Sequence, residues 1–302
     1  MGRIAAIDLG TNSMKLLVAD AGDGEIETVI DRFRVTRLGE GMGERPLLRD
    51  GAVERNLESL RLFADEAREA GARRIVAAGT EALRAARNAP DFLARAEREC
   101  GVAVEILTGE EEARLSWIAA LSAFDPIEGP VLLFDTGGGS TEFVFGRGGA
   151  IASRASLPLG SRVLAEAFLR SDPPGPEERT RLDHRLAFAL DELEGEAARV
   201  IGVGGTVTTL AAVFLGVEPY DPARVGGASL PLAEVERQIT LYASLPGERR
   251  REIPGLHPDR ADVILAGAAL VRAVLRRFGA PSLLVSDRGL RHGLLIDRFL
   301  RD

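Results

Sequence analysis

Cysteine is almost absent from this sequence of 302 residues, which contains Cys100 alone. A single cysteine excludes an intrachain disulfide and is typical of a protein that folds in a reducing compartment. No stretch approaches the about 18 uninterrupted apolar residues of a transmembrane helix. The first apolar run begins within a few residues of Met1, which leaves no room for a signal peptide. We therefore expect a cytoplasmic protein with no membrane segment.

Histidine and lysine are also scarce. No two of the three histidines have metal-ligand spacing, and Lys15 is the only lysine among 38 basic residues. The net charge of −8 argues against broad nucleic-acid binding, although local arginines could still bind a polyanion. The length and a hydrophobic content of 45% allow two domains with full cores.

One pattern occurs twice in the chain. Residues 8–13 and 135–140 both read Asp-x-Gly-x-x-Ser. Each copy lies between two apolar runs, which predicts a strand, a tight turn and a second strand. Glycine and hydroxyl residues in such a turn present N–H and O–H groups to an anion, and the leading aspartate can hold an accompanying metal ion. The sequence thus predicts two phosphate-binding loops, one in each half.

The repeat extends beyond these turns. Gly79-Thr80 has a counterpart in Gly205-Thr206, and Leu38-Gly39 recurs as Leu159-Gly160. Each half then ends with a strand and a helix, at 102–107 and 110–123 in the first half and at 282–286 and 289–300 in the second. These matches predict an internally duplicated α/β protein.

Hydrophobic periodicity places the remaining elements. We expect strands at 3–8, 15–20, 25–33 and 74–78 in the first half, and at 131–135, 141–146 and 150–157 in the second. We expect helices at 53–70, 81–87, 91–99, 177–196 and 259–278. The first of these helices should bury Leu57, Leu60, Ala64 and Ala67. Small residues at 261–269 could pack against Ala119 and Ala120 or serve ordinary core packing. The Pro- and Gly-rich segment 125–130 suggests domains of 1–124 and 125–302, the second with a helical insertion.

Five motifs in order resemble the exopolyphosphatase/guanosine pentaphosphate phosphohydrolase family. The motifs are residues 8–13, 79–84, 109–114, 135–142 and 202–206. The resemblance runs from residue 4 to about 299. It implies the actin-like ATPase superfold: α/β, with two ribonuclease-H-like domains, each a mixed sheet flanked by helices, and an interdomain cleft. It also implies the short two-domain form, release of terminal phosphate from inorganic polyphosphate, and a homodimer.

Catalysis needs a group that activates water and a cation that neutralises the phosphoryl group. The resemblance assigns the first role to Glu112, and Arg84 is the predicted charged clamp. The alternative is that Glu110, Glu111 and Glu112 complement the positive N-terminus of a helix. We prefer that alternative for Glu110 and Glu111.

The predicted metal ion is Mg²⁺ or Mn²⁺, held by Asp135 and Glu142 across the glycine-rich turn. Asp8 is the symmetry-related acid and a possible third ligand, although it could instead bond its own turn backbone. Glu142 could also point outward from its strand.

The predicted phosphate contacts come from three loops, and the alternatives for the charged residues stay open. The contacts are Thr11, Asn12, Ser13 and Lys15, then Gly137, Gly138, Gly139, Ser140 and Thr141, and finally Gly204, Gly205 and Thr206. By strand alternation Lys15 could face solvent instead. The run 249–251 reads as an exposed basic face or a track for a long polyanion, and Arg288 and Arg291 are better candidates for such a track.

Three alternatives to an exopolyphosphatase remain at this stage. One is a guanosine pentaphosphate 5′-phosphohydrolase, for which no purine pocket can be identified from the sequence. Another is a non-catalytic actin-like protein that binds nucleotide or polyphosphate. A sugar-kinase-like phosphotransferase would need an additional acceptor pocket.

Overall fold

The computed structural model describes residues 2–22, 25–42, 46–124 and 127–300, which form two compact units. The first unit contains Met1–Ala119 together with Leu290–Asp302, and the second contains Ala120–Gly289. Residues 125 and 126 of the predicted boundary lie outside the described residues. The units differ from the predicted domains of 1–124 and 125–302 chiefly in the last helix, which belongs to the first unit.

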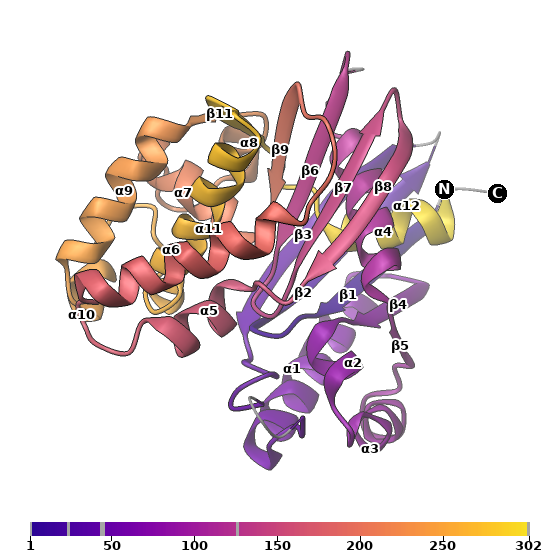
Figure 1. Cartoon of the computed structure of the whole chain (residues 1–302). Coiled ribbons are helices and arrows are strands. Elements are labelled where there is room, and N and C mark those ends of the chain that lie inside the picture. Colours follow the sequence, from indigo (N-terminus) through magenta and orange to yellow (C-terminus); the bar gives the residue numbers. More distant parts are fainter. Residues whose placement is uncertain (1, 23–24, 43–45, 125–126, 301–302) are drawn as a thin grey trace. The chain divides into compact units, whose positions relative to one another are not determined.

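The sheet of the first unit has five strands in the order β3-β2-β1-β4-β5 (Figure 1). The antiparallel strands β1 (Gly2–Leu9), β2 (Ser13–Gly22) and β3 (Glu25–Val35) form the predicted meander. The next two strands, β4 (Arg74–Gly79) and β5 (Val104–Ile106), continue the sheet in parallel. The apolar runs that predicted β1 and β2 are buried on both faces of the sheet, as expected for central strands.

Helices cover the sheet of the first unit. The longest, α1 (Asp50–Glu69), buries the predicted stripe of Leu57, Leu60, Ala64 and Ala67. It is followed by α2 (Glu81–Ala85), α3 (Ala89–Arg95), the π-helix η1 (Ala96–Cys100) and α4 (Gly109–Leu121). The π-helix ends at Gly101, whose φ of 65° is the left-handed conformation that favours glycine at a helix C-terminus.

The sheet of the second unit repeats this topology. Its strands are β6 (Pro130–Thr136), β7 (Thr141–Arg147), β8 (Ala150–Leu157), β9 (Arg199–Val203), β10 (Ser229–Pro231) and β11 (Ser282–Val285). Taken from β8, the order is β8-β7-β6-β9-β11, with β10 added at the edge. The meander pairs are antiparallel and the β6–β9–β11 pairs are parallel, as in the first sheet. The predicted duplication is therefore confirmed strand by strand.

The helices of the second unit surround a central apolar helix. They are α5 (Ser161–Phe168), α6 (Pro176–Asp191), α7 (Gly205–Leu215), α8 (Pro222–Val225), α9 (Leu232–Ser244), α10 (Gly247–Arg250), η2 (Pro258–Arg260) and α11 (Ile264–Arg277). The central helix α11 packs against α5, α6, α7 and α9. Its Gly267 lies against the side chain of Thr206. The small residues at 261–269 thus serve packing within this unit.

The last helix, α12 (Leu290–Phe299), corrects the predicted domain assignment, because it packs on β1 and β2 of the first unit. Its apolar stripe of Leu290, Leu294 and Leu295 joins a core cluster that includes residues of β1, β2 and β4. A Cβ atom at Gly293 would lie 2.1 Å from the carbonyl oxygen of Leu115, so only glycine permits this approach of α12 to α4.

Paired charges fix the orientation of α12. Arg291 donates two hydrogen bonds, of 2.5 and 2.7 Å, to the carboxylate of Asp31 on β3. Arg114 of α4 donates two, of 2.6 and 3.1 Å, to Asp297. Arg291 therefore anchors the helix to β3. Arg288 donates to the carbonyl and hydroxyl oxygens of Ser122.

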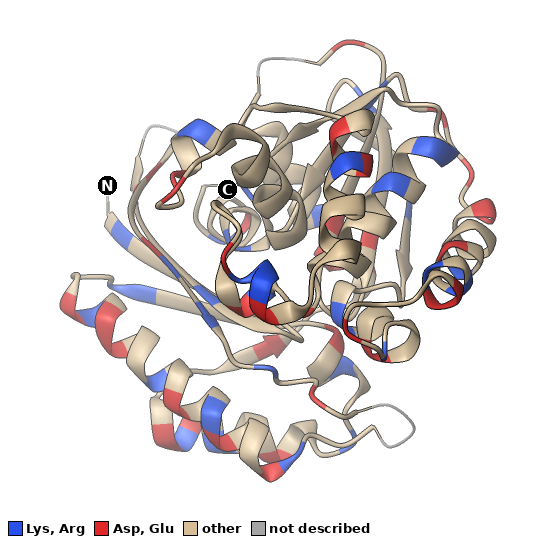
Figure 2. Cartoon of the chain, turned by 90° about the vertical axis from the view of Figure 1, so that its left-hand side faces the viewer, with Lys and Arg blue, Asp and Glu red and all other residues tan. Residues whose placement is uncertain are grey.

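Acidic and basic residues are interspersed along the helices of both units (Figure 2). Among the described residues, no helix combines the length and the apolar character that crossing a membrane requires.

Candidate active site

The first Asp-x-Gly-x-x-Ser segment forms the predicted tight turn between β1 and β2. The Gly10 N–H donates to the Ser13 carbonyl at 3.1 Å. The segment after β3 holds this turn, because Gly39 N–H donates to the Thr11 carbonyl and Arg37 N–H donates to the Asn12 carbonyl. The side chains of Thr11 and Asn12 are buried. The loop is therefore fixed by backbone hydrogen bonds from a neighbouring segment.

The second copy, between β6 and β7, is built in the same way. Gly137 N–H donates to the Ser140 carbonyl at 3.0 Å, and Gly160 N–H donates to the Gly139 carbonyl at 3.0 Å. A Cβ atom at Gly160 would lie 2.1 Å from the backbone of Gly138, which explains why glycine recurs at this position. Thr141 donates its hydroxyl to the Leu159 carbonyl. The predicted match between Leu38-Gly39 and Leu159-Gly160 thus reflects two segments that support equivalent loops.

The two hairpins differ in the residue opposite the leading aspartate. Asp8 pairs with Lys15 across β1 and β2, and Asp135 pairs with Glu142 across β6 and β7. Residues directly opposite each other in antiparallel strands share one face of the sheet. The Lys15 Nζ atom accordingly lies 3.6 Å from the Oδ2 atom of Asp8, whose exposed fraction is 5%. Lys15 is half-buried and lies on the same face of the sheet as Asp8.

The second hairpin places two carboxylates on one face. Glu142 has an exposed fraction of 2%, and its Oε1 atom accepts a hydrogen bond of 2.9 Å from the Ser156 hydroxyl of β8. The outward orientation that the sequence allowed for Glu142 is thus excluded. The Asp135 carboxylate lies beside Gly204, where a Cβ atom would be 2.9 Å from Oδ1. Gly204 has a φ of 96° and precedes α7, so both space and conformation require glycine.

In the first unit, Arg84 and Glu112 contact each other. Glu112 lies in the first turn of α4 with an exposed fraction of 8%, and its Oε2 atom is 3.2 Å from Arg84 Nη1. The same nitrogen donates to the Leu107 carbonyl at 2.7 Å, and Nη2 donates to Glu81 at 2.5 Å. Burial lowers the pKa of Arg84, but Glu112 and Glu81 more than offset this, so the pKa is raised above its usual value.

The neighbouring Glu111 has a structural role at the start of α4. Its carboxylate accepts hydrogen bonds from the backbone N–H and the hydroxyl of Thr108, and the Thr108 hydroxyl accepts one from the Glu111 N–H. This reciprocal arrangement caps the helix N-terminus. The preference for a capping role at Glu111 is therefore confirmed.

The loop before α7 contains Gly204, Gly205 and the buried Thr206. Strand registers pair Leu9 with Gly79 and Asp135 with Val203. These registers make Gly204 the structural counterpart of Gly79, whereas the sequence match predicted Gly205, one residue later.

Arg260 is a residue of this region that sequence reasoning missed. A Cβ atom at Gly205 would lie 2.1 Å from its guanidinium group. Arg260 is half-buried, and burial lowers its pKa. Its position in the short helix η2, a few residues before the apolar helix α11, was the available signal.

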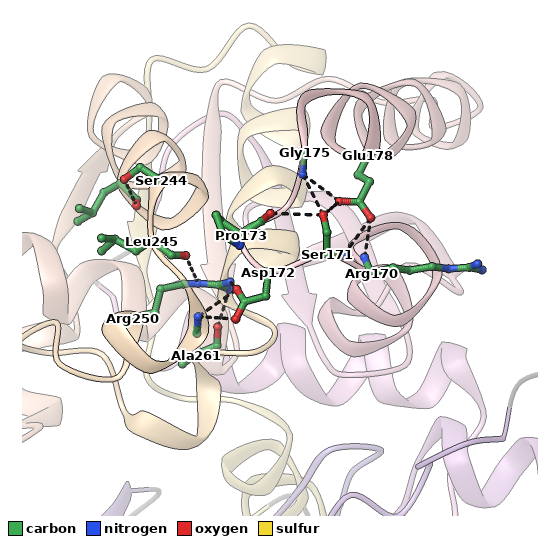
Figure 3. Close-up of polar contacts among 12 residues, drawn as sticks. Arg170, Ser171, Asp172, Pro173, Gly175, Glu178, Ser244, Leu245, Arg250 and Ala261 are labelled. Carbon is green, nitrogen blue, oxygen red and sulfur yellow. Dashed lines mark hydrogen bonds and ion pairs between the residues drawn. The ribbon is translucent and has the colours of Figure 1, made fainter.

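The basic run 249–251 is not a uniform exposed face. Arg250 has an exposed fraction of 4% and donates to the carbonyl oxygens of Leu245 and Ala261 and to Asp172 (Figure 3). Asp172 also accepts from the Gly247 N–H. The middle arginine therefore joins α10 to the segment after α5, and only its two neighbours are exposed.

The matching sheets and turns confirm the predicted duplicated α/β fold, in which each half is a mixed sheet flanked by helices. Residues 17–302 match the Ppx/GppA phosphatase family. Exopolyphosphatase 2 of Mycobacterium tuberculosis is 34% identical over 312 residues, covering 97% of this chain and 98% of that protein. The chain therefore belongs to the Ppx/GppA phosphatase family.

Solved structures agree with this assignment. The crystal structure of the Aquifex aeolicus family member is 37% identical, with a TM-score of 0.86, and covers 99% of this chain and 98% of that one. An exopolyphosphatase from Cytophaga hutchinsonii is 26% identical with a TM-score of 0.89, and 98% of each chain is covered. The predicted family resemblance is confirmed over nearly the whole chain.

Proposed function

We propose that this chain is an exopolyphosphatase that releases terminal phosphate from inorganic polyphosphate. The observation that carries the proposal is the pair of matching turns, each held by backbone hydrogen bonds and each led by an aspartate opposite a charged residue. Two such loops suit a substrate with several phosphates. The name of the M. tuberculosis relative supports this substrate.

Glu112 is the proposed general base. It accepts a proton from the attacking water while the bond from the terminal phosphorus to the bridging oxygen breaks. That oxygen remains with the shortened chain, and inorganic phosphate leaves. Arg84 lies 3.2 Å from the Glu112 carboxylate, which supports a role in holding the base and in neutralising the phosphoryl group.

Asp135 and Glu142 are the proposed ligands of Mg²⁺ or Mn²⁺. Their carboxylates face the same side of the hairpin, as oxygen ligands to such an ion require. Among the described residues, no group of three or more His, Cys, Asp or Glu side chains could hold a metal ion. Two carboxylates completed by water and phosphate oxygens are the usual Mg²⁺ arrangement. When bound, the ion would neutralise charge on the phosphate oxygens.

Asp8 is a weaker candidate for the metal, because Lys15 already places a positive charge 3.6 Å from its carboxylate. We propose that Lys15 contacts the substrate instead, together with the backbone of its own loop. The proposed phosphate-binding groups are Thr11, Asn12, Ser13, Gly137, Gly138, Gly139, Ser140, Thr141, Gly204, Gly205 and Thr206, and to these we add Arg260. The proposal includes a homodimer, which sedimentation would test.

The test is phosphate release by the purified protein with Mg²⁺, with short polyphosphate, long polyphosphate, guanosine pentaphosphate and ATP as parallel substrates. Release from polyphosphate without an acceptor supports the proposal. Preference for the pentaphosphate would replace it with the guanosine pentaphosphate phosphohydrolase. Tight binding with no release from any substrate would contradict an enzymatic role and favour a polyphosphate-binding protein.

A further inference from the structure

We infer that Ser156 is a positioning residue that orients the carboxylate of Glu142 for metal binding. The inference rests on the metal site proposed above and concerns a residue to which no role has been given. It starts from the strand registers, which place Asp135, Glu142 and Ser156 directly opposite one another on β6, β7 and β8. Side chains in such a row lie on the same face of the sheet.

The hydrogen bond within this row joins the hydroxyl of an exposed residue to a buried carboxylate. Ser156 donates to Glu142 Oε1 at 2.9 Å, while the glutamate itself is 2% exposed. A hydrogen bond to one oxygen restricts rotation of the carboxylate and thus fixes the directions in which both oxygens present lone pairs. Partners of this kind, bonded to a metal ligand rather than to the metal, strengthen binding by keeping the ligand in the required orientation.

The first half of the molecule shows what the same row becomes without this arrangement. There the corresponding residues of β1, β2 and β3 are Asp8, Lys15 and Phe33. An ammonium group replaces the second carboxylate, and an aromatic ring replaces the hydroxyl. The row with two acids, Asp135 and Glu142, therefore has a hydroxyl group beside them, and the row that contains Lys15 has no hydroxyl group. This difference links Ser156 to the proposed metal function of the second hairpin rather than to hairpin formation in general.

The test measures binding of Mn²⁺ to the full-length protein by electron paramagnetic resonance of the free ion, in the absence of substrate. We expect Ser156→Ala to raise the dissociation constant roughly tenfold, as for loss of other hydrogen-bonding partners of metal ligands. Ser156→Thr keeps the hydroxyl and should restore the affinity to within about twofold. Ser153→Ala is the matched control, because Ser153 is also exposed on β8 but lies opposite Phe145 in the register.

Phosphate release gives a second readout. In Ser156→Ala, the Mn²⁺ concentration for half-maximal activity should rise by the same factor, while kcat at saturating metal stays within about threefold of the wild type. A merely structural role would instead lower the melting temperature and leave the metal dependence unchanged.

The results of these experiments distinguish a failure of the inference about Ser156 from a failure of the proposed metal site. If Glu142→Gln weakens Mn²⁺ binding and Ser156→Ala does not, the hydrogen bond is an ordinary cross-strand contact and the inference is wrong. An equal loss of affinity in Ser153→Ala and Ser156→Ala would also overturn it. If the wild type does not bind Mn²⁺, or if Glu142→Gln binds it as tightly as the wild type, the proposed metal site itself fails.

Discussion

Lys15 and Glu142 occupy the same position in the two halves of the molecule, each opposite the aspartate that leads its loop. The duplicated fold thus carries opposite charges at one pair of equivalent sites. We interpret this as a difference in function between the two hairpins. Lys15 of the first hairpin would contact phosphate directly, and the second hairpin would bind a metal ion.

Replacement of Lys15 tests the first part of this interpretation. Lys15→Met should raise the KM for polyphosphate roughly tenfold, because it removes one contact between charged groups worth about 1.5 kcal/mol. Lys15→Arg keeps the charge and should stay close to the wild type. Steady-state kinetics on polyphosphate of one length would measure both. An unchanged KM in Lys15→Met would show that the ammonium only neutralises Asp8.

Glu112→Gln tests the proposed base. We expect kcat to fall by about 10²–10⁴-fold, the usual contribution of general base catalysis, while polyphosphate still binds. The matched control is Glu111→Ala in the same helical turn. It removes the capping interaction with Thr108 and should lower the free energy of unfolding by about 1 kcal/mol with little change in kcat. Full activity in Glu112→Gln would refute the assignment.

Gly293→Ala tests the close approach of α12 to α4. The added Cβ would lie 2.1 Å from the Leu115 carbonyl oxygen, and such overpacking against backbone should cost about 1–3 kcal/mol of stability in urea unfolding. For comparison, a Cβ at Gly51 in α1 would be 3.7 Å from its nearest neighbour, the end of Arg55. Gly51→Ala should therefore stabilise the protein by about 0.5–1 kcal/mol. Wild-type stability in Gly293→Ala would contradict the packing.

The carboxylate of Glu178 should make the stability of the protein depend on pH in the acidic range. Hydrogen bonds from the Ser171 hydroxyl and from the backbone N–H groups of Gly175, Arg170 and Ser171 lower its pKa from 4.5 to about 2 (Figure 3). Because the folded state has the lower pKa, this contribution to stability is complete above pH 4.5 and is lost as the pH falls toward about 2.

Glu178→Gln should therefore be less stable than the wild type at pH 7, and the difference should shrink steadily between pH 4.5 and pH 2. Urea unfolding of both proteins at several pH values would measure it. A difference that does not change with pH would show that the carboxylate charge contributes nothing.

Much of the architecture could be predicted because the information is local and repeated. The two turns, their flanking apolar runs and the supporting glycines at 39 and 160 are visible in the sequence, and each has a counterpart. Once the turn is assigned, the offset from Asp135 to Glu142 fixes their pairing across the hairpin.

What could not be predicted depends on contacts between distant segments. Arg250 belongs to a basic run that suggests a solvated surface, yet Asp172 and two carbonyl oxygens bury it. Ser156 acquires its partner only through the register of β8 on β7. The apolar stripe of α12 shows that the helix covers a sheet, but the stripe alone does not reveal which of two similar sheets it covers.

The packing of α12 has a consequence for biosynthesis. The ribosome makes the strands of the first unit first, but Leu290, Leu294 and Leu295 complete the cluster that covers Ile4, Ala6 and Leu17. The half that is translated first therefore cannot complete this cluster until α12 has been translated, after the whole of the second unit.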